Sequence, residues 1–369
     1  MDINKKKTKI NIASYIIIIL SIVVLICYVV FVDGFSELYN VIMNARLRWL
    51  FAGAGLLIIY WLLESWILHI ASKKLYKKQK FIHTVKTTII GQYFNCITPS
   101  ASGGQPMQAY HMHNCGMPVG NAVGALLLRF VIYQVMLTVY CAIVLILGGH
   151  RIAGKLWLVL IGFVVNAVVV AGLLGLAFAP RLIQKVGRGL VHFLNKLHII
   201  KDKAKFDQLI DVEVEKFCKS MKRSGSDIKS IIKMGIITIF QLTAYFLIPF
   251  CVFKALGVAL NPFWAICASA FVLMVSSFVP LPGAAGGAEG SFLIYFGILL
   301  GPAESAKGAT AVLLWRILTF YFPILVGAFF AKNISKKVAS VEDVIKEETT
   351  EIISEIQDDG ELNVSDYDS

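Results

Sequence analysis

The sequence predicts an all-α integral membrane protein, with about six full transmembrane helices and two re-entrant helical hairpins that together form an inverted repeat. Three observations lead to this fold class. Hydrophobic residues make up 57% of the 369 residues and charged residues only 16%, whereas a soluble domain carries about 25% charged residues. Six apolar stretches are long enough to cross a bilayer, and one motif rich in proline and glycine occurs twice.

The full spans are expected where roughly 20 apolar residues follow one another, the length that crosses the hydrocarbon core. The first stretch follows four lysines and lacks a small-x-small cleavage site, so we expect a retained anchor and not a signal peptide. Pro249 and Pro323 should kink the fifth and sixth spans. The expected spans are 12–32, 48–71, 120–148, 156–179, 228–256 and 306–331, and the interrupted apolar regions are 82–118 and 263–300.

Basic residues gather in alternate loops, and this pattern sets the expected orientation. Lysine and arginine are frequent near the N-terminus, in 73–80, in 181–223 and in 332–337. By the positive-inside rule these loops and both termini are cytoplasmic, and contact with anionic lipid accounts for the net charge of +12 without a nucleic-acid partner. The chain then divides into a basic cytoplasmic N-terminus (1–11), a first membrane half (12–180), a cytoplasmic amphipathic insertion (181–227), a second membrane half (228–331) and an acidic cytoplasmic tail (332–369).

The repeated motif is Pro-x-x-x-Gly-Gly, and it occupies residues 99–104 and 282–287. Each copy precedes a spanning helix that carries one arginine, Arg129 in the first half and Arg316 in the second. Two matches in the same order, at nearly the same separation, indicate an internal repeat. The motif glycines are Gly103, Gly104, Gly286 and Gly287.

The topology of this repeat follows if each interrupted region is a hairpin that enters and leaves by one face. The first hairpin then enters from the cytoplasm, after the lysines of 73–80, and the second enters from outside. Each half reads as span, hairpin and span, and the two halves point in opposite directions. Paired segments of this kind indicate a transporter whose binding site lies between the halves, near the bilayer midplane.

The chemistry of the motif has two interpretations. Non-helical backbone at membrane depth is tolerated only where it is buried in protein or lines a watery cavity, and half-helices that begin there present free N–H groups and a positive dipole end to an anion such as phosphate. The alternative is that the motif is only a tight packing turn between helices, because glycine lets the chain turn and neighbouring helices approach closely.

Charged residues inside the spans also allow two interpretations. An arginine at the centre of a helix costs about 2.5–3.5 kcal/mol on insertion scales and is seldom kept without use. Arg129 and Arg316 either form structural ion pairs with Glu64 and Glu289, or they grip a phosphate in bidentate fashion. An ion pair that opens to admit substrate would serve both roles. Neutral donors near these arginines are Gln105, Gln108, Gln134 and Gln241.

No cofactor or metal is expected, and no residue is assigned a catalytic role. The chain has no Cys-x-x-Cys pair, and His111 and His113 beside Cys115 lack the wider spacing and second ligand pair of a typical zinc site. A nucleotide-binding P-loop is also missing from the sequence. Any transport would therefore draw on gradients, membrane potential or coupled lipid synthesis.

The segments "ITPSASGGQPMQAY", "FVPLPGAAGGAEGSFLIYFG" and "LLWRILTFYFP" resemble the transmembrane domain of the lysylphosphatidylglycerol synthase/flippase family, over about residues 10–335. Stand-alone, flippase-like members occur in bacteria and archaea. The resemblance implies a multi-pass protein of a prokaryotic cytoplasmic membrane that moves or binds an anionic or aminoacylated phospholipid, or a related isoprenoid lipid carrier. Full-length synthases add a soluble aminoacyltransferase domain, whereas about 38 residues follow Ala331 here, so lysyl transfer is not expected.

Three hypotheses remain open at this point. The first is a lipid flippase that holds a headgroup between its inverted halves. The second is a membrane enzyme, labelled phosphatidylglycerol lysyltransferase, with Glu64 or Glu289 as general base. The third is a scaffold that binds lipid or protein without transporting it.

Overall fold

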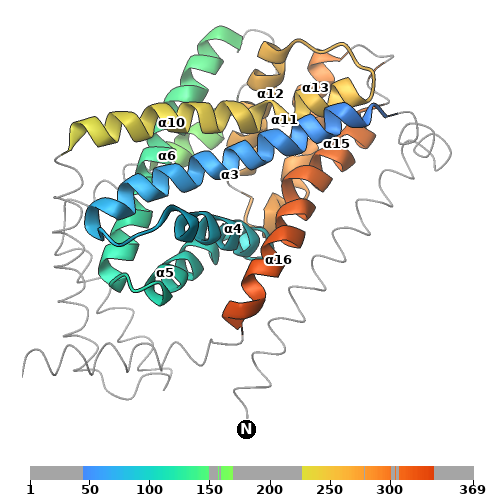
Figure 1. Cartoon of the computed structure of the whole chain (residues 1–369). Helices are drawn as coiled ribbons and strands as arrows, with labels where there is room; N and C mark the ends of the chain where they lie inside the picture. The colour runs from blue at the N-terminus through green and yellow to red at the C-terminus, as the bar shows by residue number, and fades with distance from the viewer. Residues whose placement is uncertain are drawn as a thin grey trace, which may run out of the picture.

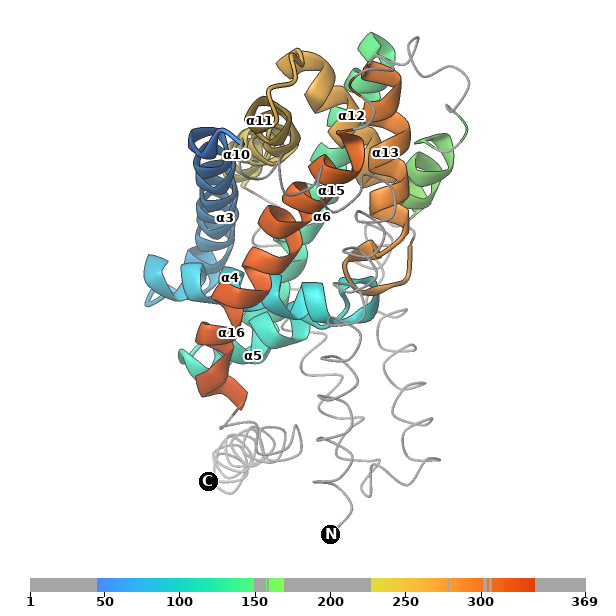
Figure 2. The ribbon, with the colours of Figure 1, turned by 90° about the vertical axis from the view of Figure 1, so that its right-hand side faces the viewer.

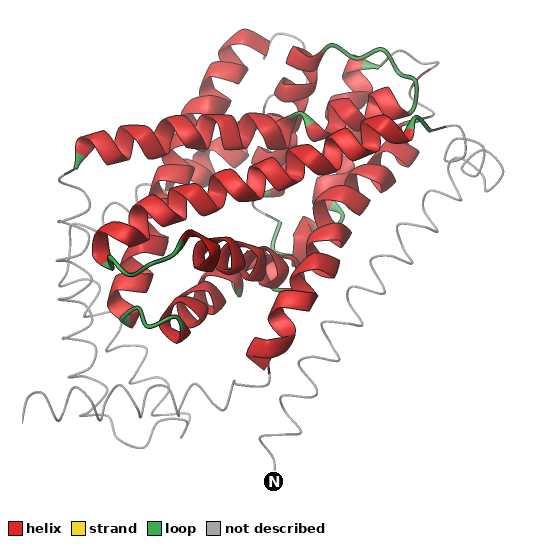
Figure 3. Ribbon diagram, viewed as in Figure 1, coloured by secondary structure: helices red, strands yellow, loops and turns green. Residues whose placement is uncertain are grey.

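The structure is a computed structural model that describes residues 45–148, 157, 159–168, 227–277, 279–300, 304 and 307–335. Every regular element in these ranges is helical (Figure 3). The N-terminal segment 1–11, the expected span 12–32, nearly all of the insertion 181–227 and the tail beyond Ser335 lie outside the described residues.

Four spans in the described part of the chain are long and apolar enough to cross a membrane, and they match four of the six expected ones. The helix Val159–Val168 covers part of a fifth, at 156–179. The four spans are α3 (Leu47–Leu75), α6 (Val119–Gly148), α10 (Ile228–Phe246) with α11 (Ile248–Ala255), and α15 (Gly308–Arg316) with the π-helical turn η4 (Ile317–Tyr321) and α16 (Phe322–Ser335).

Irregularities in two spans fall at the expected prolines. Proline cannot donate a backbone hydrogen bond to the preceding turn, and the helix is interrupted at Leu247, two residues before Pro249. The π-helical turn η4 ends directly before Phe322 and Pro323. π-helical turns are rare, and inside an α-helix they occur mostly as single turns where the helix is kinked.

Each interrupted apolar region folds as helix, short turn and helix. In the first half these are α4 (Phe81–Ile97), the 3₁₀ turn η1 (Pro99–Ala101) and α5 (Gly104–Asn114). In the second half they are α12 (Pro262–Ser276), the 3₁₀ turn η3 (Pro282–Ala284) and α13 (Gly287–Leu299). The motif therefore takes the same role twice, because its proline opens the turn and its second glycine begins the next helix.

The two halves pack in a reciprocal way. The first helix of each broken region contacts the span that follows the broken region of the other half, so α4 packs on α16 and α12 packs on α6. The turns η1 and η3 contact each other. In Figure 2, α4 and α5 lie at the lower end of the bundle and α12 and α13 at the upper end.

The helices α3 and α10–α11 lie side by side along their length (Figure 1). At one end Lys74 Nζ is 3.0 Å from Asp227 Oδ2, and at the other the N–H of Arg46 donates to the carbonyl of Ala255 at 2.9 Å. The first described span of one half thus runs antiparallel to the first span of the other.

Candidate functional site

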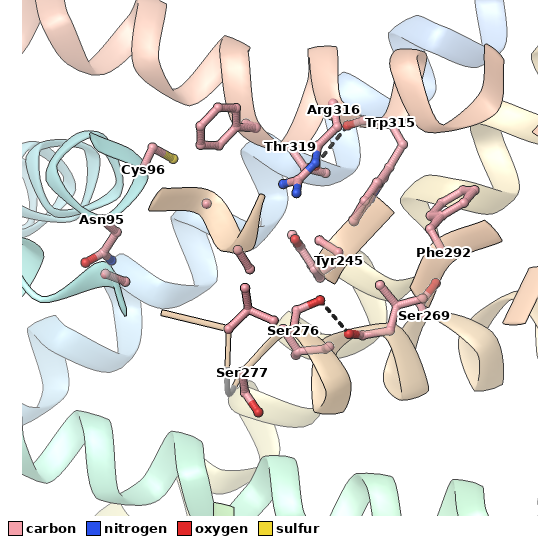
Figure 4. A pocket seen from close by; sticks show the side chains of 18 of the residues that line it. Asn95, Cys96, Tyr245, Ser269, Ser276, Ser277, Phe292, Trp315, Arg316 and Thr319 are labelled. Carbon is pink, nitrogen blue, oxygen red and sulfur yellow. Dashed lines mark hydrogen bonds between the residues drawn. The ribbon is translucent and has the colours of Figure 1, made fainter. Parts of the chain in front are cut away.

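A cavity of about 310 Å³ lies where the two broken regions meet, a volume within the range of small-molecule sites, about 300–1,000 Å³. One wall is aromatic: the ring of Phe292 is 4.3 Å from that of Phe296 and 4.9 Å from that of Trp315, between centroids. The other walls carry polar groups from both halves, among them Asn95, Tyr245, Ser276, Ser277, Arg316 and Thr319 (Figure 4).

Arg316 points into this cavity from the end of α15 (Figure 4). The residue is only 6% exposed, and its Nε donates to Glu289 Oε1 at 2.7 Å. Its guanidinium carbon lies 5.0 Å from the ring centroid of Trp315 and 5.4 Å from that of Phe320. The Nη2 atom is buried and has no hydrogen-bond partner among the described residues. A buried charged donor without an acceptor is costly, so this atom is ready for an anionic ligand.

Glu289 holds Arg316 from outside the cavity lining. Its Oε1 accepts from Arg316 Nε, and its Oε2 accepts the N–H of Gly286 at 2.7 Å, which caps the start of α13. Both carboxylate oxygens are therefore engaged with protein donors. Gly286 itself has a φ of +80°, a conformation that glycine adopts without steric cost.

A second polar cluster surrounds Arg129 on α6. Arg129 Nη1 donates to Glu64 Oε1, Arg129 Nη2 lies 3.5 Å from Gln108 Oε1, and Gln92 Nε2 donates to Glu64 Oε2 at 2.7 Å. Glu64 is 3% exposed. Gln92 also lines the cavity, so it connects this cluster to the site of Arg316. Both expected ion pairs are thus present, but only Arg316 of the two arginines lines the cavity.

The motif glycines lie beside the cavity and allow close packing. A Cβ on Gly104 would overlap Asn95, one on Gly287 would overlap Val279, and one on Gly103 would press on Thr98. Gly103 N–H also donates to Thr98 Oγ1 at 2.9 Å. These glycines, Gly286, and the half-buried Gln105 at the start of α5 do not contribute to the cavity lining that the structure describes.

The comparisons with known proteins agree with this architecture. The sequence model described as "Lysylphosphatidylglycerol synthase TM region" matches residues 17–327. The chain belongs to this family. It is also similar to a UPF0104 membrane protein of Archaeoglobus fulgidus, with 25% identity over 305 residues that cover 79% of this chain and 89% of that protein. The chain is therefore a multi-pass membrane protein of the lysylphosphatidylglycerol synthase transmembrane family.

Backbone conformation marks cavity residues in this family member that the sequence pattern did not identify. Ser100, Ala101 and Ala284 have φ values of 51°, 53° and 53°, and Gly283 has 60°. All four line the cavity. Left-handed backbone costs about 1–2 kcal/mol for a residue with a side chain, and such strain concentrates at functional sites. The repeated motif indicated this region from the sequence. The residues that line the cavity, however, stand at the variable positions of the motif and not at the two glycines that define it.

No metal site is found in the described ranges, where no group of three or more histidine, cysteine, aspartate or glutamate residues could hold an ion. His111 instead has its Nδ1 2.8 Å from the hydroxyl oxygen of Thr87. The described lining of the cavity offers a guanidinium, hydroxyls, amides and aromatic rings to a ligand.

Proposed function

We propose that this protein is a lipid translocase. It moves an anionic or aminoacylated phospholipid, or a related isoprenoid lipid carrier, between the leaflets of the cytoplasmic membrane. The observation that carries this proposal is the cavity between the two broken regions, into which Arg316 directs a buried guanidinium. One nitrogen of that guanidinium has no partner in the part of the chain that the structure describes. Arginine is suited to hold a phosphate at two points.

The arrangement of the halves supports a transport role. The antiparallel first spans and the reciprocal contacts of α4 with α16 and of α12 with α6 are what an inverted repeat produces. In transporters of this type the halves rock around a site near the midplane. We therefore propose six spans, two re-entrant hairpins and cytoplasmic termini, with the meeting point of η1 and η3 at the pivot.

The proposed cycle uses the contacts around Arg316. A lipid phosphate enters the cavity and is held by the outer nitrogens of the guanidinium, while Glu289 keeps Nε in place. The acyl chains stay in the bilayer. Gln92 lines the cavity and also donates to Glu64, so in this cycle occupation of the cavity is coupled to the packing of α3, α4 and α6.

The test is lipid scrambling in proteoliposomes with a fluorescent phosphatidylglycerol. Wild type is compared with the double variant Glu289→Gln/Arg316→Gln, which removes the charge pair without leaving a carboxylate unpaired. The matched control is Lys233→Gln, because Lys233 is a cation on α10 that lies 5.6 Å from the ring of Trp66 and does not line the cavity. We expect the double variant to lose flux and the control to keep it.

One result would contradict the role of Arg316, and two others would contradict the translocase. A folded double variant that moves lipid at the wild-type rate removes Arg316 from the mechanism. Binding of lipid without flux under any gradient favours a scaffold. Formation of aminoacylated lipid from lysyl-tRNA and phosphatidylglycerol by the purified protein favours a lysyltransferase.

A further inference from the structure

We infer that the cavity selects a headgroup of net negative charge, a phosphate ester that also carries hydroxyl groups, over an aminoacylated headgroup with ammonium groups. This inference rests on the proposed function, because it takes the cavity to be the place where the headgroup is held. It goes further by choosing between the two classes of lipid that the translocase could carry.

The charge of the lining is the first argument. Of the described residues that line the cavity, Arg316 alone is charged. The carboxylates of Glu289 and Glu64 are outside that lining and already engaged, since Glu289 binds Arg316 and Gly286 and Glu64 binds Arg129 and Gln92. Within the described part of the chain, a ligand in this cavity therefore meets a cation with an open donor and no carboxylate in the lining.

An ammonium group is disfavoured by the same surroundings. Charges interact strongly where water is excluded, so a lysyl group would be repelled by Arg316 without a carboxylate to compensate. Aromatic faces can hold a cation in place of a carboxylate. Here, however, the rings of Trp315 and Phe320 already face the guanidinium, at 5.0 and 5.4 Å, and those of Phe292 and Phe296 stack on each other, at 4.3 Å between centroids.

Hydroxyl groups on the ligand fit the rest of the lining. Four of the lining hydroxyls already donate their protons to backbone carbonyls, over distances of 2.6 to 2.9 Å, and therefore offer oxygen lone pairs. Lone pairs accept from the O–H groups of a glycerol or sugar. The residues concerned are Ser269, Ser276, Ser277 and Thr319. The cavity thus combines one anion-binding group with several acceptors for neutral donors.

The first experiment measures equilibrium binding to the full chain in detergent. The probes are dihexanoyl-phosphatidylglycerol, its lysyl ester, glycerol 1-phosphate and inorganic phosphate. We expect phosphatidylglycerol to bind at least about tenfold more tightly than the lysyl ester, since repulsion between like charges at an interface is of this size or larger. If glycerol 1-phosphate bound as tightly as phosphatidylglycerol, the ligand would be identified as a water-soluble phosphate ester, and the preference for negative charge would be the same.

The second experiment reverses the selectivity. Ser276→Asp places a carboxylate in the lining, and Ser276→Asn is its neutral control of nearly the same shape. The ratio of the affinity for phosphatidylglycerol to the affinity for its lysyl ester should be lower in Ser276→Asp than in Ser276→Asn, by about tenfold or more. An unchanged preference would overturn the inference.

The outcomes separate the inference from the proposed function. Flux of both lipids at similar rates, or faster flux of the lysyl ester, overturns the charge selection and leaves the translocase intact. Absence of flux and of binding for every probe overturns both.

Discussion

Glu289 joins the guanidinium of Arg316 to the first turn of α13, since one carboxylate oxygen lies 2.7 Å from Arg316 Nε and the other 2.7 Å from the N–H of Gly286. The pair in the first half is built differently, because Glu64 comes from α3 and is shared between Arg129 and Gln92. The two arginines of the repeat therefore have different environments. Among the described residues each arginine has one buried nitrogen without a partner, Arg316 Nη2 and Arg129 Nε, but only Arg316 lines the cavity.

Arg129 should be needed mainly for stability. Arg129→Gln leaves the carboxylate of Glu64 buried without its cation, and breaking a buried pair in this way costs about 3–5 kcal/mol. The double variant Glu64→Gln/Arg129→Gln should recover most of this loss. Thermal unfolding in detergent, followed by circular dichroism, measures both. A double variant as unstable as the single one would show that the pair is not the cause.

Replacement of a helical glycine by alanine should destabilise the protein only where the space for a Cβ is already filled. Gly287→Ala would force Val279 aside, and Gly104→Ala would displace Asn95, so both should lower the unfolding temperature. Gly290 on the same helix as Gly287 has open space around its Cβ position. Gly290→Ala should therefore match wild type or gain about 0.5–1 kcal/mol from helix propensity. Equal losses at Gly287 and Gly290 would contradict the packing argument.

The strained turn η3 predicts an unusual response to glycine. Ala284 has a φ of 53°, whereas its neighbour Ala285 has a φ of −53°. Ala284→Gly should relieve the left-handed strain, so we expect it to be more stable than Ala285→Gly by about 1–2 kcal/mol. Chemical or thermal unfolding of the two variants in the same detergent gives the comparison. A more stable Ala285→Gly would mean that the turn is not strained.

The contact between α3 and α10 should depend on pH. Hydrogen bonds from Lys74 and from Ser230 lower the pKa of Asp227 to about 2 from its ordinary 3.8. A lowered carboxyl pKa stabilises the folded state above the unfolded value, and this contribution is lost as pH falls through the folded value. Asp227→Asn keeps a side chain that can cap the helix but removes the negative charge. The variant should therefore unfold at a slightly lower temperature than wild type at pH 6.

The control for this effect is the same pair of proteins in acid. The difference between Asp227→Asn and wild type should shrink as the pH is lowered from about 4 towards 2. A constant difference over that range would show that the charge of Asp227 makes no contribution. Because the pair is exposed, the whole effect should be small.

The spanning helices were predicted from apolar length, and ion pairs of Arg129 with Glu64 and of Arg316 with Glu289 were one of two interpretations of the charges inside spans. The sequence could not tell that Arg316 lines a cavity and Arg129 does not, since this depends on the contacts of η1 with η3. It also directed attention to Gly103 and Gly287, whereas Ser100 and Ala284 line the cavity. Serines such as Ser276 carry no periodic signal, because one hydroxyl in an apolar helix is compatible with many environments.

The reciprocal packing of α4 on α16 and of α12 on α6 means that neither half of the chain is complete without the other. Each broken region covers a surface of a span that belongs to the opposite half, so the two halves stabilise each other. Co-expression of 1–180 and 181–369 as separate chains should then yield one complex, and their failure to associate would count against this mutual dependence.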